Sequence, residues 1–335
     1  MNKLSLIKPL LIGAGALSIG AGIALAQEVE AFTKPVGYQT HVMKNGFNVF
    51  GVNFVNAPLV AGALTGVNGT TLTDTNADFS GLDTALQHTI EFEDGSWAVI
   101  ASIAGTNVTT ESNISAQVAA GDRYIVRQVK TIGEIFGPEN ESGLEAGTDA
   151  NSSDIIWVPD GSGGFRKLYY TIGDGFFLTP GWKDLTTADE NQADAGILFT
   201  HGLIFERVAA EDLEVIVTGH VKTTPTDVVV DQEYTYLSRI YPTGSTLDNS
   251  SLVDGVTIGD SATTSDNVWM PDGSGGFTKN YYTTGDGFFL TEGWKDVATG
   301  DADAADTETT SGYIMQIVGD TYTVTVTPPD FYADL

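Results

Sequence analysis

The sequence predicts an all-β protein with two tandem, related domains of a β-sandwich or barrel-like kind, the first carrying an inserted small β-subdomain. A block at residues 154–185 returns at residues 266–297 with 24 identities in 32 positions. Short runs rich in Val, Ile, Thr and aromatic residues alternate with turns rich in Gly and Asn, as in sandwiches and barrels. No run has the length and period of a sustained amphipathic helix.

The first 26 residues have the features of an export signal. Lys3 and Lys8 precede an apolar, glycine-rich run, and Ala24-Leu25-Ala26 is a small-residue cleavage site. The apolar run alone also approaches the length of an uncleaved anchor, but the Ala-x-Ala ending favours cleavage before Gln27. We therefore expect an exported protein, in the periplasm, at the cell surface or outside the cell, with no membrane span after signal removal.

The chain is strongly acidic. It has 15 Lys and Arg against 44 Asp and Glu, a formal net charge of −29. Such a chain repels nucleic acid and anionic membrane surfaces, so these classes of partner are excluded as a default. The acidity indicates that the negative charge keeps the protein soluble. Divalent cation binding is the alternative. The sequence has no cysteine, so an exported fold of this kind depends on packing and hydrogen bonds instead of disulfides.

The first domain is expected at residues 27–222. It begins with two strand-like runs on either side of Asn45-Gly46, a dipeptide typical of a tight hairpin. Residues 59–121 have no counterpart in the second copy and are predicted to form the inserted subdomain. A strand pattern resumes at residues 123–136, and further strands are expected at residues 196–208 and 213–221. A helical turn at residues 209–213 is the most helix that this part predicts.

The second domain, at residues 223–335, is expected to repeat the first in part. It follows the linker at residues 223–226 and ends with an alternating, uncharged strand at residues 322–327. We expect this strand to pair within its own sheet. The alternative is pairing with a neighbouring molecule, which would make an oligomer by strand addition.

Inside the duplicated block, the sequence DGSGG predicts a hairpin turn. A four-residue loop at residues 160–163 would place Trp157 and Tyr170 on one face, and other residues of that face change between the copies, so it is predicted to be the wetter one. Both aromatic residues are kept, as Trp269 and Tyr282, which makes all four candidates for stacking on an extracellular glycan or a partner protein. Packing beneath a neighbouring strand or against the other domain is the alternative.

The sequence GWKD closes each copy. Trp182 and Trp294 are predicted to plug the end of a core at a corner of the chain, and Lys183-Asp184 is predicted to be a surface pair that contributes little to stability.

No residue pattern in the sequence indicates catalysis. The histidines are scattered, and no HExxH, GxSxG, P-loop or cysteine nucleophile occurs. With 44 acidic residues, carboxylate pairs of the glycosidase kind arise by chance and discriminate nothing. Calcium is the one cofactor with a positive indication, because two loops space oxygen ligands at alternate positions; the alternative is solvated acidic loops. The candidate ligands are Asp74, Asn76 and Asp78 in one loop and Asp301, Asp303 and Asp306 in the other.

The order of several motifs resembles an uncharacterised family of exported bacterial β-rich proteins. These motifs are GFNVFGVNF, GALTGVNGTTLT, RYIVRQVKTIGEIFG, IIWVPDGSGGF, YYT, GW, GLIFERV and LEVIVTG. The resemblance covers residues 38–221, and the second copy repeats its later half. It implies export and this fold plan, and it implies no activity. One departure is Lys183 and Lys295, where the family more often has Arg.

The sequence thus favours an exported surface or extracellular protein with a structural or binding role and no catalytic activity. An enzyme or a carbohydrate-binding protein that acts on an extracellular polymer is the alternative. An enzyme would require a concave cleft with converging polar groups, whereas a binding module would present flat sheets, exposed edges or an aromatic patch.

Overall fold

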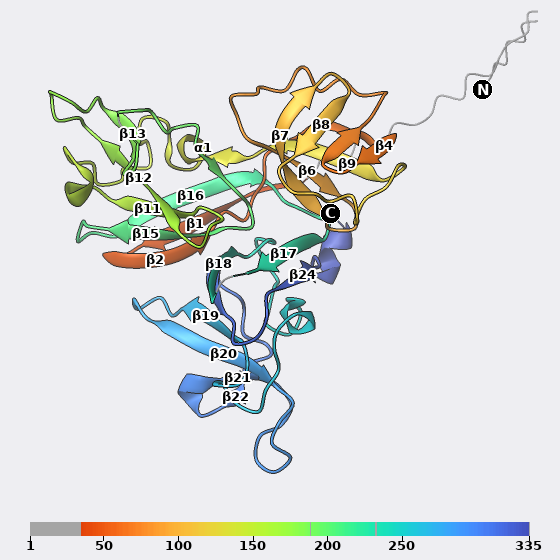
Figure 1. Cartoon of the computed structure of the whole chain (residues 1–335). Helices are drawn as coiled ribbons and strands as arrows, with labels where there is room; N and C mark the ends of the chain where they lie inside the picture. Colours follow the sequence, from red (N-terminus) through yellow and green to blue (C-terminus); the bar gives the residue numbers. More distant parts are fainter. Residues whose placement is uncertain (1–34, 188, 232, 335) are drawn as a thin grey trace, which may run out of the picture. The chain divides into compact units, whose positions relative to one another are not determined.

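The computed structural model describes residues 35–187, 189–231 and 233–334. The expected signal peptide and its cleavage site lie outside these ranges. Contacts group residues 34–335 into one compact unit, which is built of strands joined by turns and short helical segments (Figure 1). The all-β prediction is therefore confirmed. None of the helices in the described ranges has the length and hydrophobicity needed to cross a bilayer.

Strands β1, β2 and β10–β16 form what we call the first half. Their bounds are β1 (Val36–Met43), β2 (Gly46–Gly51), β10 (Lys130–Thr131), β11 (Ile155–Pro159), β12 (Phe165–Thr171), β13 (Gly181–Asp184), β14 (Gly196–Ile197), β15 (Gly202–Arg207) and β16 (Leu213–His220), with the short helix η1 (Ala150–Ser152) before β11. Five strands form a sheet in the order β13-β12-β11-β15-β2, while β1 pairs with β16 and β10 with β14. Met43 of β1, Val215 of β16 and Phe205 of β15 meet in one core, so the two main sheets pack as a sandwich.

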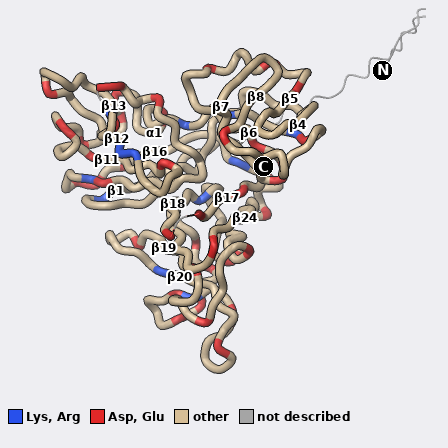
Figure 2. Tube along the Cα trace, in the orientation of Figure 1, with Lys and Arg blue, Asp and Glu red and all other residues tan. Residues whose placement is uncertain are grey.

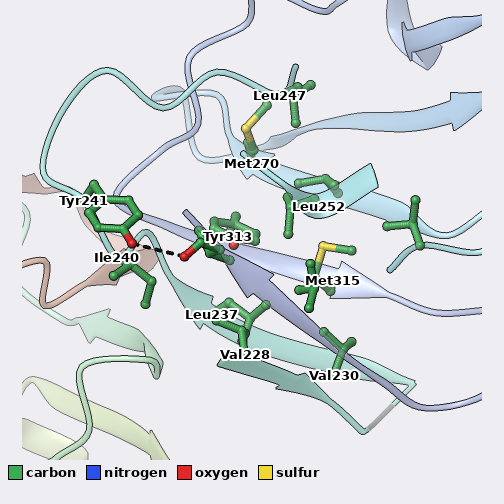
Figure 3. Packing of buried hydrophobic residues seen from close by; sticks show 14 of the residues in the cluster. Val228, Val230, Leu237, Ile240, Tyr241, Leu247, Leu252, Met270, Tyr313 and Met315 are labelled. Atoms are coloured by element: carbon green, nitrogen blue, oxygen red, sulfur yellow. Dashed lines mark hydrogen bonds between the residues drawn. The ribbon is translucent and has the colours of Figure 1, made fainter. Parts of the chain in front are cut away.

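The second half consists of β17–β24. Its elements are β17 (Thr226–Val230), β18 (Tyr234–Ser238), η2 (Leu252–Asp254), β19 (Asn267–Pro271), β20 (Phe277–Thr283), β21 (Gly293–Asp296), η3 (Val297–Thr299), β22 (Ala302–Asp303), β23 (Gly312–Gln316), β24 (Tyr322–Val326) and η4 (Asp330–Asp334). The strand order β21-β20-β19-β23-β18 repeats that of the first half, with β22 added at the edge, and β17 pairs with β24 as β1 does with β16. Figure 3 shows the core of this half, where Val228, Leu237 and Met315 from three strands pack together.

The correspondence extends beyond the identical block. Asp154 accepts the backbone N–H of Glu145 at 2.9 Å and that of Val208 at 2.9 Å. Asp266 accepts those of Thr257 and Val318 at 2.8 and 2.7 Å. In each half this buried carboxylate therefore fastens the start of the duplicated hairpin to two loops.

The inserted segment folds as a sheet of its own. Its strands are β3 (Pro58–Ala63), β4 (Gly66–Asn68), β5 (Thr71–Thr73), β6 (His88–Phe92), β7 (Trp97–Ala104), β8 (Asn107–Thr110) and β9 (Arg123–Gln128), in the order β3-β9-β6-β7-β8-β5-β4. We call it the inserted sheet; it has a separate core around Phe79, Ile90 and Val126. β9 lies between β3 and β6, so the inserted sheet continues past residue 121, where the sequence had suggested that the first domain resumes.

Residues 132–136 are helical, which corrects the strand expected there. Helix α1 (Ile132–Phe136) begins after Thr131, whose side chain accepts the N–H of Glu134, and the Glu134 carboxylate accepts the N–H of Thr131 in return. This capping box has the sequence signature Ser/Thr-x-x-Glu. The turn expected at residues 209–213 is not helical, and Leu213 already begins β16.

The hairpin predicted at Asn45-Gly46 does not form. β1 pairs with β16, and β2 pairs with β15. The chain instead passes from one sheet of the sandwich to the other at this dipeptide. The Asn45 amide donates to the carbonyl oxygens of Val208 and Ala209 at 3.2 and 3.0 Å, and Gly46 has a φ of +92°. The Asn-Gly signal therefore marks a corner between sheets.

The register predicted for the duplicated hairpin was wrong by one residue. Trp157 lies opposite Lys167, and Ile156 lies opposite Leu168. The loop thus has five residues, 160–164, because the Asp160 carboxylate accepts the N–H groups of Ser162 and Gly164. A one-residue slip moves every side chain of a strand to the other face.

The GWKD prediction was half right. Trp182 and Trp294 are fully buried in the two cores. Lys183 and Asp184 do not form a surface pair, because both are buried and have different partners. Lys183 Nζ lies 2.5 Å from an Asp189 carboxylate oxygen, and Arg166 Nε lies 3.0 Å from Asp184.

The two halves pack against each other through equivalent faces. Val49 and Ile204 of the first half and Ile314 of the second form one buried cluster, with Trp157 and Trp269 packed at its margin. Main-chain bonds join the halves as well, since the Ser238 N–H donates to the Thr200 carbonyl at 2.9 Å. The last strand, β24, pairs with β17 along its length, as expected from the sequence.

Candidate functional site

The most prominent surface feature of the described chain is a pair of loops with the same sequence, GDGFFLT, at residues 173–179 and 285–291. We call them the Phe-Phe loops. One joins β12 to β13 and the other joins β20 to β21. The side chains of Phe176 and Phe177 are 90% and 87% exposed, and those of Phe288 and Phe289 are 90% and 96% exposed. Each half therefore presents two adjacent phenyl rings to solvent.

The first Phe-Phe loop is held in shape by one carboxylate. Asp174 Oδ1 accepts the backbone N–H groups of Phe176, Phe177 and Leu178 at 2.8, 2.7 and 2.9 Å. The Asp174 N–H in turn donates to the Leu178 carbonyl at 3.3 Å. The backbone hydrogen bonds from Leu178, Phe176 and Phe177 hold the pKa of Asp174 below its ordinary value. The loop is thus an ordered turn with the carboxylate ionised.

The second Phe-Phe loop repeats this geometry. Asp286 Oδ1 accepts from Phe288, Phe289 and Leu290 at 2.8, 2.8 and 2.9 Å. Gly285 has a φ of +83°, and a Cβ there would lie 2.4 Å from the Leu290 carbonyl oxygen. Glycine at this position is therefore required by both the backbone angle and the tight turn.

The base of each loop is fastened to the body of the protein. The Thr171 hydroxyl donates to the Gly147 carbonyl and accepts the N–H of Gly173. At the other end, buried Lys183 Nζ donates to the Thr179 hydroxyl at 3.1 Å. The second half has the same bonds at the equivalent positions. The Lys of GWKD therefore supports the loop from beneath.

Exposed phenyl rings on ordered loops are a candidate contact surface. Burying one Phe side chain stabilises a protein or a complex by about 1.5–3 kcal/mol. The four exposed Phe side chains contribute no such free energy to the folded chain and could contribute it to a complex. Exposed apolar groups with a polar surround mark interaction sites, and Asp and Glu greatly outnumber Lys and Arg along the chain (Figure 2). These residues were not predicted as a site, although the seven consecutive identities between the two copies in a loop are a signal for them.

The aromatic residues chosen from the sequence lie elsewhere. Trp157 is half-buried at the junction of the halves, its Nε1–H donates to Glu206 at 3.0 Å, and Lys167 Nζ lies 3.5 Å from the ring centroid. Trp269 has the same surroundings, with Gln316 as acceptor and Lys279 at 5.0 Å from the ring centroid. Both indoles are therefore engaged by neighbours in the protein.

Tyr170 and Tyr282 lie on the opposite face from these tryptophans. Tyr170 packs edge-on against Trp182 at 5.7 Å between ring centroids, and Tyr282 packs likewise against Trp294 at 5.6 Å. Their hydroxyls lie 3.2 and 3.3 Å from carboxylates of Glu139 and Glu292. The structure thus separates the four predicted stacking residues into two pairs with internal partners.

In the first of the two loops predicted to bind calcium, the carboxylates have partners within the protein. Asp74 is buried and accepts the Tyr124 hydroxyl at 2.8 Å and the N–H of Asn76 at 2.9 Å. Asp78 is exposed and accepts the N–H of Ser80. Burial, and then the hydrogen bond to Asp74, raise the pKa of Tyr124.

The second of the loops predicted to bind calcium is more exposed. Asp303 lies opposite Lys295 in the sheet, and its carboxylate accepts the N–H of Ala305 at 3.1 Å. Asp301 has a left-handed φ of +64°, and Asp306 lies nearby in the chain. In the described ranges, no three His, Cys, Asp or Glu side chains lie close enough together to hold a metal ion.

Comparison with known proteins gives no match. No family model matches the chain, and no curated protein or solved structure matches it.

Proposed function

We propose that this chain is an exported, non-catalytic binding protein that attaches to a partner protein through its two Phe-Phe loops. The observation that carries the proposal is the presence of two adjacent, fully exposed phenyl rings on an ordered loop in each half. A loop whose N–H groups are already bonded to Asp174 or Asp286 loses little conformational freedom when it binds, and preorganisation of this kind raises affinity.

The surroundings of the loops favour a protein over a lipid surface. Carboxylates flank both loops, Asp189 beside the first and Glu292 beside the second, and the net charge of −29 repels anionic membranes. A partner that offers apolar pockets with a cationic rim complements both the phenyl rings and these carboxylates. Two equivalent loops also allow bivalent attachment, in which the second contact forms at a high effective concentration.

Photocrosslinking tests the proposal on the exported protein. The photoreactive analogue benzoylphenylalanine replaces Phe177 in one variant and Phe289 in another, and Phe331, an exposed Phe of η4 outside the loops, serves as the matched control position. We expect both loop variants to capture the same protein partner and the control variant not to capture it. Capture of lipid or polysaccharide at the loops, or the same products from all three positions, would overturn the proposal.

Serine variants supply the second arm. The replacements Phe176→Ser and Phe177→Ser, made together with the equivalent pair in the second loop, should abolish capture by benzoylphenylalanine placed at Leu178. The melting temperature should stay unchanged, because the replaced rings are exposed and contribute little to the folded state.

A further inference from the structure

The junction between the halves contains two cavities at equivalent places. One, of about 230 Å³, lies between the turn at residues 160–164 and the corner that joins β17 to β18. The other, of about 430 Å³, lies between the turn at residues 272–276 and the corner that joins β1 to β2. Each turn thus reaches the corner of the opposite half. Only the second cavity has the size of ordinary small-molecule sites, which begin near 300 Å³.

The linings of the two cavities can be compared position by position. β2 and β18 occupy the same place in their sheets, so the residues that lead into them correspond. His41 of the second cavity stands where the first has Val228. Lys44 stands where the first has Asp231. Hydrogen-bond donors therefore replace an apolar and an acidic side chain in the second cavity.

Arg239 is the most buried cation of the second cavity, with 6% of its surface exposed. Its Nη1 donates to the Glu308 carboxylate at 3.0 Å and to the Thr309 carbonyl at 2.5 Å, and its Nη2 donates to the Pro242 carbonyl. Its Nε–H is buried and has no acceptor among the described residues. A buried donor left unpaired costs about 1–3 kcal/mol.

His41 lines the same cavity and is 8% exposed. Its Nδ1 lies 3.3 Å from the Ser311 hydroxyl. Burial, and then the charge of Arg239, lower the pKa of His41 to about 4, so the ring is neutral at pH 7. When Ser311 donates to Nδ1, the ring proton is on Nε2, and Nε2 too has no partner in the part of the chain that the structure describes.

We propose that the second cavity binds a small organic carboxylate, whose oxygens accept from Arg239 Nε and His41 Nε2. Both groups are donors, and a carboxylate offers acceptors on two oxygens in one plane, as an arginine side chain requires. Lys44, whose Nζ donates to the Gly273 carbonyl and so fastens the turn of the second half over the cavity, adds a second positive charge at the rim. The first cavity, with Val228 in place of His41 and Asp231 in place of Lys44, lacks that preference.

The test uses glucuronate, with glucose as a neutral probe that differs from it only in the carboxylate. The readout is the imidazole ¹⁵N and ¹H signals of the full chain, with His41 assigned from His41→Val. We expect glucuronate to shift the His41 signals in a saturable way and glucose to leave them unchanged. Binding measured by calorimetry should weaken about tenfold or more in His41→Val, because one charged hydrogen bond is lost.

Matched variants separate a lost contact from a damaged fold. His41→Val installs the residue of the first cavity, His41→Gln keeps an N–H donor and should retain part of the affinity, and His201→Ser alters the first cavity alone and should bind like wild type. Equal binding of glucose and glucuronate, binding that survives His41→Val, or no saturable response to glucuronate at tens of millimolar would each overturn the proposal.

Discussion

A buried group of three charges joins the inserted sheet to the chain between the halves, and it gives the sharpest stability prediction. Glu91 of β6 lies 3.2 Å from Arg127 Nε of β9 and 2.9 Å from Lys222 Nζ, which follows β16. The three side chains are at most 8% exposed. One carboxylate therefore compensates two cations in a site with little solvent screening.

The replacements of this group should differ in a fixed order. Glu91→Gln leaves two buried cations side by side without an anion, and removing one partner of a buried pair costs about 3–5 kcal/mol. Lys222→Met leaves the ion pair of Glu91 and Arg127, which has no net charge, and keeps an apolar side chain near Phe199. It loses the charged hydrogen bond, which is worth about 1.5–3 kcal/mol. We therefore expect Glu91→Gln to lower the free energy of unfolding more than Lys222→Met.

Urea unfolding followed by tryptophan fluorescence measures this order, and hydrogen exchange of the β6 and β9 amides locates the loss. The fluorescence of Trp97 in the inserted sheet should respond to loss of this junction, since its Nε1–H donates to the Asp227 carbonyl across it. The control is Glu93→Gln, which breaks the exposed pair of Glu93 and Arg123 and should change stability by less than about 1 kcal/mol. A Lys222→Met protein less stable than the Glu91→Gln protein would refute this account of the charges.

Two further predictions compare the halves. Trp182 Nε1 donates to the Gly137 carbonyl at 2.9 Å, whereas the buried Trp294 Nε1 has no partner in the described ranges, so Trp182→Phe should destabilise by about 1 kcal/mol more than Trp294→Phe in urea unfolding. Asp174→Ala and Asp286→Ala should speed hydrogen exchange of the amides in their own Phe-Phe loop without changing the melting temperature. Because the folded pKa of each carboxyl is lowered, its bonds stabilise the loop above the ordinary pKa of about 4 and are lost as the pH falls through the lowered value. Protection factors of the loop amides, corrected for the intrinsic pH dependence of exchange, that stayed constant as the pH fell through that lowered pKa would contradict this.

The fold class could be predicted from the sequence because alternation and turn residues are local signals. The partners of β1 and β2 could not, because Asn45-Gly46 specifies a reversal of the chain and leaves open which strands it joins. In the structure the chain also passes from one sheet to the other between β15 and β16, so β2 pairs with β15 and β1 pairs with β16. Pairing between strands far apart in the sequence therefore decides the partners of β1 and β2.

The candidate site was missed for a related reason. The predicted aromatic residues lie within strands, where the register of the hairpin decides which face is exposed, and a loop longer by one residue places Tyr170 in the core. The buried Lys183 shows the same limit, since the Lys-Asp dipeptide has a surface composition, and its partners Thr179 and Asp189 lie outside that dipeptide.

Some identities between the two copies are explained by the fold, and others are not. The DGSGG turn is identical in both halves, and each turn lies against the corner of the opposite half, with Phe165 5.1 Å from Tyr236 between ring centroids and Lys44 bonded to Gly273. Internal packing thus accounts for that identity. Asp174 and its glycines are likewise required by the turn of the Phe-Phe loop, but no contact among the described residues requires two exposed phenyl rings at its tip. The identity of those rings in both halves is therefore the part of the duplicated sequence that an external partner explains best.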